Sequence, residues 1–233
     1  MTDTRIETVA LTDGTELRLT VAEPDNVVRG GLVVLHEARG VTPRVRELVS
    51  ALAEEGWLAA APHLYHRIGV DELDAEHLDE DVHDQVQDLD VDSVIDDADA
   101  TFLWLGDRGV AVDRLGVMGF DVGGAAALVV AARRQLGAAV TIGGGGILEP
   151  LSDSLPALID IVSDVGCPWL GLYGADSSIP RDQIDKLREV ADGAPVATDV
   201  VRFPASDHRF ESEPESAHEA WKRTRNWFDL HLR

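Results

Sequence analysis

The chain has 233 residues, 45% of them hydrophobic, and its 43 acidic and 20 basic side chains give a formal net charge of −23 at pH 7. So much negative charge repels nucleic acid and anionic lipid, and no apolar run reaches the ~18 residues of a membrane span, so neither partner is expected. Cys167 is the only cysteine, which excludes an internal disulfide and a multi-cysteine metal or iron–sulfur site.

The N-terminal residues and the charged residues lead to two further expectations, one about location and one about salt. The first ten residues lack a basic segment followed by an apolar stretch, so a secretory signal is not expected and a cytoplasmic location is. Lysine occurs only at Lys186 and Lys222, whereas arginine is common. With the acidic excess, this scarcity favours a protein of a salt-accumulating halophile over an ordinary acidic cytosolic protein.

Apolar runs typical of buried strands alternate with segments of helical period along the chain. In chain order we expect the strands Glu16–Val21 and Gly31–His36, the helix Thr42–Glu55, the strand Trp57–Ala61, the helix Asp92–Gly106, the strand Leu115–Phe120, the helix Gly123–Leu136, the strands Ala138–Ile142 and Trp169–Tyr173, the helix Arg181–Ala191, the strand Thr198–Phe203 and the helix Pro214–Leu230. This alternation predicts an α/β protein with a mainly parallel, doubly wound sheet and helices on both faces.

No linker rich in Pro, Ser or Gly divides the chain, and no period of 20 to 50 residues repeats. We therefore expect residues 1–233 to form a single domain. The stretch Val70–Asp92 is dense in Asp, Glu and His, and we expect it to be a solvated excursion from the fold.

A glycine-flanked turn joins the strand that ends at Phe120 to an alanine-rich helix, in the sequence LGVMGFDVGG at 115–124. This is the setting of a nucleophile elbow, in which a strained strand-to-helix turn presents a side chain and the residues two positions away must be small. Gly119 and Gly123 meet that requirement, and Asp121 is the residue presented. The alternative is a glycine-rich turn that merely packs the helix on the strand.

An acid and a histidine follow Asp121 in the chain order that an α/β-hydrolase triad requires. Asp176 follows the strand 169–173, and His208 follows the strand 198–203. In this arrangement Asp176 would orient His208, and His208 would serve as the base.

Five short segments, HEARG at 36–40, the run at 52–65 that ends in PHLY, GFDVGG at 119–124, GAD at 174–176 and HRF at 208–210, occur in this order. Together they resemble the motifs of the dienelactone hydrolase family over most of the chain. The resemblance implies an α/β-hydrolase fold and a small-molecule substrate. We expect a monomer or small homo-oligomer and no metal or other cofactor. The resemblance further implies an oxyanion hole made by the N–H groups of Val122 and Ala38, with Glu37 beside the nucleophile.

The chain departs from the family at the nucleophile itself. Asp121 stands where the family has its cysteine, and no serine occupies a comparable turn. Cys167 cannot replace it, because it lies at the start of a strand and therefore at the wrong end of the sheet. His63 takes the place of the family's usual aspartate in the PDLY motif.

No arginine stands where the dienelactone enzymes hold their substrate carboxylate. Arg39, Arg67 or Arg209 could bind an anion, or could be solvated or paired with a local carboxylate. The run Gly143–Gly146 could cradle an anion, but it lacks the Lys-Ser/Thr of a phosphate loop and is expected to be a turn near the site. His63, His66, His77 and His83 match no metal-ligand spacing, so no metal is expected.

An aspartate at the elbow suits a particular chemistry. Its carboxylate is ionised at neutral pH and can open an alkyl halide or an epoxide, after which His208 would activate water to hydrolyse the alkyl-enzyme ester. Attack on an ordinary ester would instead give a reactive mixed anhydride. If Glu37 lies close to Asp121, the two would share a proton and one could act as a general acid or base. The alternative to an enzyme is a non-catalytic relative that binds a small ligand in the same pocket.

Overall fold

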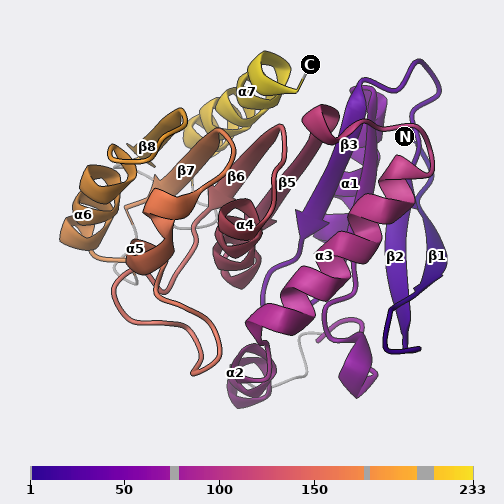
Figure 1. Ribbon diagram of the computed structural model, residues 1–233, viewed down its shortest axis with the longest axis horizontal. Coiled ribbons are helices and arrows are strands. Elements are labelled where there is room, and N and C mark those ends of the chain that lie inside the picture. Colours follow the sequence, from indigo (N-terminus) through magenta and orange to yellow (C-terminus); the bar gives the residue numbers. More distant parts are fainter. Residues whose placement is uncertain (1, 74–78, 176–178, 204–212, 233) are drawn as a thin grey trace.

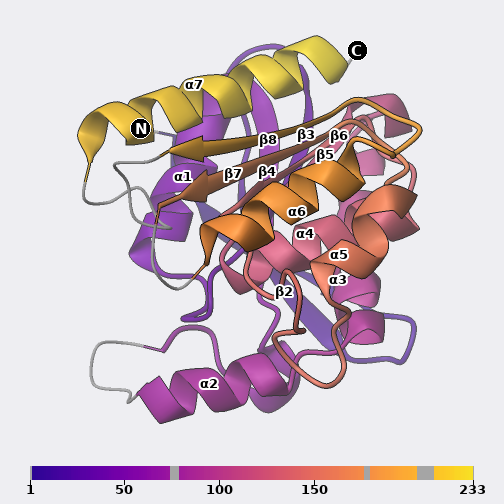
Figure 2. The same cartoon turned by 90° about the vertical axis from the view of Figure 1, so that its left-hand side faces the viewer.

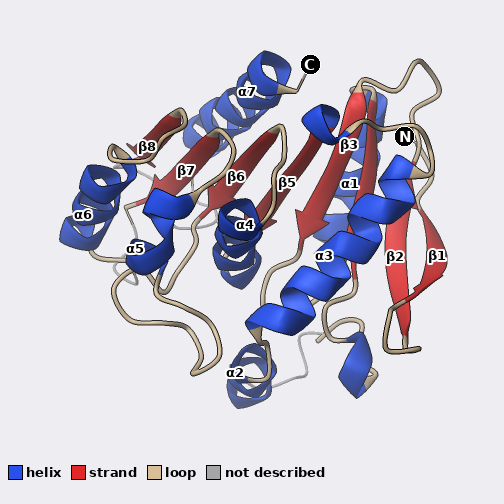
Figure 3. Ribbon diagram, viewed as in Figure 1, coloured by secondary structure: helices blue, strands red, loops and turns tan. Residues whose placement is uncertain are grey.

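The computed structural model describes residues 2–73, 79–175, 179–203 and 213–232. Its centre is an eight-stranded sheet in the order β1-β2-β4-β3-β5-β6-β7-β8 (Figures 1 and 3). The strands are β1 (Arg5–Ala10), β2 (Glu16–Ala22), β3 (Gly30–Leu35), β4 (Trp57–Pro62), β5 (Leu115–Phe120), β6 (Ala138–Ile142), β7 (Trp169–Gly174) and β8 (Thr198–Phe203). Only the β1–β2 and β2–β4 pairs are antiparallel, so the predicted α/β class and mainly parallel sheet are confirmed.

Helices cover both faces of this sheet. They are α1 (Pro43–Glu54), α2 (Asp79–Gln87), α3 (Val91–Gly106), α4 (Val122–Arg133), α5 (Leu158–Ile161), α6 (Arg181–Ala191) and α7 (Pro214–His231). Figure 2 shows α1 and α7 on one face, and α3, α4 and α6 on the other. In the described part of the chain, no helix is both long and apolar enough to cross a membrane.

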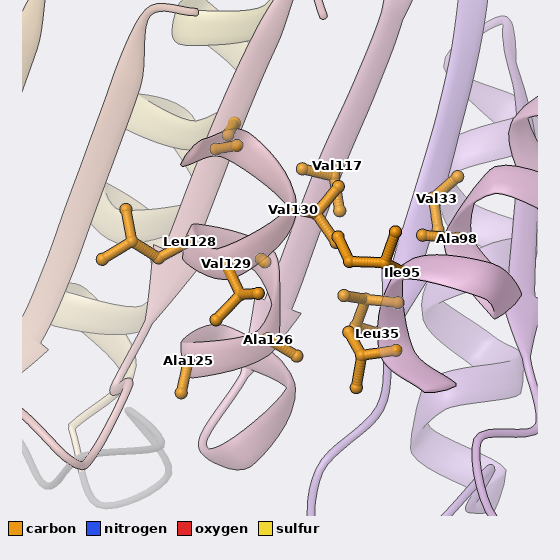
Figure 4. Close-up of a cluster of buried hydrophobic side chains, with 14 of the residues drawn as sticks. Val33, Leu35, Ile95, Ala98, Val117, Ala125, Ala126, Leu128, Val129 and Val130 are labelled. Atoms are coloured by element: carbon orange, nitrogen blue, oxygen red, sulfur yellow. The ribbon is translucent and has the colours of Figure 1, made fainter. Parts of the chain in front are cut away.

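Two apolar cores form because successive side chains of a strand point to opposite faces. On β3, Leu32 and Val34 belong to the core under α1 and α7, whereas Val33 and Leu35 belong to the core under α3 and α4. Figure 4 shows the second core, where strand side chains meet Ile95 and Ala98 of α3 and the valines of α4.

Three elements were not expected from the sequence, and one of them is α5, a helix of only four residues. Strand β1 is an edge strand whose side chains are all exposed or only partly buried, so it has no buried apolar run to reveal it. Helix α2 lies within the acidic stretch predicted to be a solvated excursion, but Val82 and Val86 pack against the core. Next to it, Ser152 Oγ donates to Leu89 O (3.1 Å), so the expectation for this stretch is wrong.

The order of the strands places the HEARG loop beside the predicted elbow. Strands β3 and β5 are parallel neighbours, and Leu35 pairs with Gly119. Because parallel strands end at the same edge of a sheet, His36 and its successors emerge next to Asp121.

Candidate active site

Asp121 has an unusual backbone conformation, φ 55° and ψ −120°. Among the residues that the structure describes, it is the only non-glycine residue with positive φ. Such a conformation costs of the order of 1–3 kcal/mol and persists only where its surroundings hold it. Here the Asp121 N–H donates to Ile142 O (2.9 Å), and the Ala125 N–H donates to Asp121 O (3.1 Å), so the turn is fixed to β6 and to α4.

The two glycines of the turn are required by close backbone contacts. A Cβ added to Gly119 would lie 1.9 Å from the carbonyl oxygen of Gly123. A Cβ added to Gly123 would lie 2.3 Å from the carbonyl oxygens of both Leu35 and His36. Helix α4 therefore begins directly against the end of β3, with Val122 as its first residue.

Capping does not explain an aspartate at this position. Aspartate is a favoured N-cap residue because its carboxylate can accept from the first N–H groups of a helix. Asp90 does so at the start of α3, accepting from the Ser93 N–H at 2.9 Å. Asp121 occupies the N-cap position of α4, but its side chain makes no capping hydrogen bond.

The loop after β3 is held by a buried histidine. His36 is 0% exposed; its Nε2 accepts from the Leu64 N–H (3.1 Å), and its Nδ1 lies 2.7 Å from Glu37 O. Since Nε2 accepts, the proton is on Nδ1, which donates to the Glu37 carbonyl. Burial lowers the pKa of His36 to about 4, so the ring is neutral at neutral pH.

Tyr65 holds the next peptide of this loop. Its hydroxyl donates to Ala38 O (3.0 Å), and its ring meets His36 edge-on. The pKa of Tyr65 is raised, first by burial and then by the negative charges of Asp121 and Glu37. The HEARG loop and the elbow therefore converge around Tyr65.

An apolar pocket of about 200 Å³ lies beside this cluster. It is bounded by α1, α7 and the ends of β5 and β6, and its lining residues are Glu37, Arg44, Val45, Leu48, Phe120, Ile142, Ala217, Ala220, Trp221 and Thr224. Phe120 directly precedes Asp121, and the Ile142 carbonyl accepts a hydrogen bond from the Asp121 N–H. The pocket therefore adjoins the elbow.

Two of the histidines considered as metal ligands make other contacts. His63 Nε2 lies 2.9 Å from Thr20 Oγ1, and its Nδ1 lies 2.8 Å from Asp71 Oδ1. His66 Nε2 lies 3.2 Å from the buried Asp97. Within the described ranges, no group of three or more His, Cys, Asp or Glu side chains is suited to a metal ion.

The arginines considered as anion ligands are also engaged where they are described. Arg67 forms an ion pair with Asp97 (2.9 Å), and Arg39 has a long contact with Leu73 O (3.5 Å). In the run Gly143–Gly146, Gly143 donates to Leu172 O (2.8 Å), and Gly144 lies against α4, where an added Cβ would be 3.3 Å from the backbone of Gly124. This run is thus a packed turn next to the elbow.

Cys167 is buried ahead of β7, at the opposite edge of the sheet from the elbow, and burial raises the pKa of its thiol to about 12. Such a thiol is a poor nucleophile.

Asp176 and His208 lie outside the described residues, as do His77 and Arg209.

The structure therefore brings together Asp121, Val122, Glu37 and Ala38 of the predicted site. It adds His36 and Tyr65, which belong to the HEARG and PHLY segments but for which the sequence predicted no role. In the sequence, each could have been found as a polar side chain within three residues after an otherwise apolar strand.

Several known proteins are similar to this chain over most of its length. The model of the dienelactone hydrolase family matches residues 17–232. A Yersinia pestis protein named "Putative carboxymethylenebutenolidase" is 32% identical over 97% of this chain and 88% of its own length. A carboxymethylenebutenolidase of Rhodococcus opacus is 29% identical over 86% of this chain and 81% of its own. The crystal structure of a "Putative Dienelactone Hydrolase" from Klebsiella pneumoniae subsp. pneumoniae has a TM-score of 0.87 at 31% identity, covering 97% of this chain and 98% of that one.

Proposed function

The chain belongs to the dienelactone hydrolase family, and from that premise we propose that it hydrolyses a small organic molecule with Asp121 as a covalent nucleophile. The observation that carries the proposal is the strained backbone of Asp121 at the β5–α4 turn. Strained backbone conformations of this kind cluster at active sites and ligand-binding sites, and capping does not account for the aspartate here. An aspartate there supports a carboxylate nucleophile in the position where the family has a thiol.

The chemistry that suits this nucleophile is displacement at carbon. A carboxylate oxygen of Asp121 forms a bond to a carbon of an alkyl halide or epoxide while the carbon–halogen or carbon–oxygen bond breaks, and the leaving group takes the electron pair. Water, deprotonated by His208, then attacks the ester carbonyl of Asp121. The N–H groups of Val122 and Ala38 stabilise the negative charge on that carbonyl oxygen, and collapse of the intermediate releases the alcohol and the free carboxylate.

The pocket beside the elbow favours a substrate with an apolar portion. Most of its lining side chains are apolar, including Leu48, Phe120 and Trp221, and Glu37 and Arg44 are the charged ones. Binding there would place a reactive carbon next to Asp121 while burying the rest of a haloalkane or epoxide.

A second candidate is hydrolysis of a lactone or ester with Asp121 as a general base for water. The observation in its favour is that the negative charges of both Asp121 and Glu37 act on the Tyr65 hydroxyl. A carboxylate beside a bound water can take a proton from it as a general base, without forming an ester.

A substrate panel tests the proposal. Protein purified in molar KCl would be assayed with haloalkanes, haloacids, epoxides, lactones and p-nitrophenyl esters, alongside Asp121→Asn and His208→Ala. We expect turnover of a halide or an epoxide that both variants lose. Turnover confined to lactones or esters would support the general base, and no turnover above the variants with any class would leave a ligand-binding protein.

A further inference from the structure

One peptide group of the HEARG loop is held on its carbonyl side by a buried imidazole. The Glu37 carbonyl accepts from His36 Nδ1 (2.7 Å) and from the Gly40 N–H (3.0 Å). This carbonyl and the Ala38 N–H belong to the same planar unit. In a trans peptide they point in opposite directions, so the bond from His36 turns the Ala38 N–H away from the imidazole.

The direction of that bond is fixed by the other side of the ring. The Leu64 N–H donates to Nε2 at 3.1 Å, which leaves Nδ1 as the donor. The ring is 0% exposed, so water does not compete for either nitrogen. The turn after β4 thereby determines which way a peptide after β3 faces.

The peptide before it, between His36 and Glu37, lies against the elbow. The His36 carbonyl would be 2.3 Å from a Cβ at Gly123, and Tyr65 fixes the next carbonyl, that of Ala38, at 3.0 Å. Two consecutive peptides of the loop are thus held by buried side chains directly beside the start of α4.

We propose that His36 is a positioning residue for catalysis, which orients and polarises the Glu37–Ala38 peptide so that the Ala38 N–H stabilises an oxyanion. The inference rests on the proposed function, because the Ala38 N–H acts only if an oxyanion forms at Asp121 or on a substrate. A hydrogen bond to a carbonyl strengthens the N–H of the same peptide as a donor. A donor fixed in advance lowers the barrier without changing the binding of the ground state, so the effect falls on kcat rather than on KM.

A matched pair of substitutions separates this role from packing. His36→Asn keeps a donor near the position of Nδ1 but loses the acceptor for Leu64, whereas His36→Gln keeps an acceptor near Nε2 but loses the donor to Glu37. We expect kcat to fall by roughly 10- to 100-fold in His36→Gln with KM within about twofold. In His36→Asn we expect kcat to stay within about fivefold of the native value, although both variants lose similar thermal stability.

A second readout needs no turnover. The sequence contains two Glu–Ala pairs, Glu37–Ala38 and Glu219–Ala220, so labelling Glu with carbonyl ¹³C and Ala with ¹⁵N isolates two amide signals. The Ala38 signal should move in His36→Gln and stay near its native position in His36→Asn, while Ala220 on α7 stays unchanged in both.

The outcomes distinguish the inference from the function on which it rests. If the native protein turns over a substrate that Asp121→Asn does not, and His36→Gln matches the native kcat, the positioning role fails alone. If the native protein has no activity, the proposed function fails, and the Ala38 signal still decides whether His36 orients the peptide. Equal effects of the two substitutions on kcat and on Ala38 would reduce His36 to a packing residue.

Discussion

At the scale of single residues, the site depends on a backbone conformation that only its neighbours make possible. Asp121 holds a φ of 55° because its N–H and C=O are bound to β6 and α4, and because Gly119 and Gly123 leave no side chain in the way. The strain lowers the stability of the fold in exchange for the placement of a carboxylate.

Replacing Asp121 by glycine should therefore stabilise the protein. Glycine adopts positive φ without a Cβ clash, and relief of ~1–3 kcal/mol of strain should exceed the ~0.5–1 kcal/mol of added chain entropy. We expect a net gain of about 1 kcal/mol in the free energy of unfolding, with loss of activity. Denaturant unfolding at fixed molar KCl measures it.

The control is Asp192→Gly, at the end of α6, where the backbone is ordinary helix (φ −61°, ψ −19°). There glycine has no strain to relieve and should destabilise by roughly 0.5–1 kcal/mol. Equal losses in the two variants would show that the conformation of Asp121 stores no strain.

At the scale of elements, sequence patterns identified most of the sheet because buried parallel strands are continuous apolar runs. The bounds of β5, β6 and β8 agree with the prediction. Strand β1 was not predicted because none of its side chains is buried, and α2 was not predicted because its charged residues conceal the spacing of Val82 and Val86. The elbow was predictable from glycine spacing, but the bond from His36 to Glu37 was not, since it depends on the backbone of Leu64 in the turn after β4.

Helices α1 and α7 form two walls of the apolar pocket, so a change on α7 should alter substrate selection. Ala217 is partly buried and lines the pocket. Ala217→Leu should raise KM about tenfold for bulky apolar substrates and hardly change it for two-carbon ones, because a missing or added methylene in an apolar site is worth ~1–3 kcal/mol. Steady-state kinetics over a series of chain lengths measures the selectivity.

His218 is exposed on the same helix, so His218→Leu adds a leucine without entering the pocket and should leave the series unchanged. A uniform effect of Ala217→Leu on all chain lengths would mean that substrates bind elsewhere.

At the scale of the whole molecule, charge dominates. Even with every basic side chain paired, 43 acidic against 20 basic residues leave 23 negative charges. Many arginines already hold carboxylates, as Arg134 holds Asp99 (2.7 Å) and Arg225 holds Glu55 (3.1 Å). The remaining repulsion between exposed charges is screened within ~10 Å at 0.1 M salt and ~3 Å at 1 M.

Stability should therefore rise with salt. Screening that contributes about 2 kcal/mol would raise Tm by roughly 4–8 °C in a chain of this size. We expect Tm to rise by this amount between 0.05 M and 2 M KCl, and differential scanning calorimetry measures it.

A variant with less negative charge separates screening from other effects of salt. Glu149, Asp153 and Glu189 are exposed, and changing them to Gln, Asn and Gln should raise Tm at low KCl but not at high KCl. A native Tm that is flat across the series would contradict adaptation to salt.

The fate of a single oxygen atom tests the central claim most directly, namely that Asp121 forms a covalent ester. One turnover of a competent halide or epoxide would be run in H₂¹⁸O with enzyme in excess, and both the product and the peptide that contains Asp121 would be weighed by mass spectrometry. Because water attacks the ester carbonyl, the oxygen newly bonded to the substrate comes from the carboxylate. We predict unlabelled product and one ¹⁸O on Asp121; ¹⁸O in the product of the first turnover, with Asp121 unlabelled, would contradict the account.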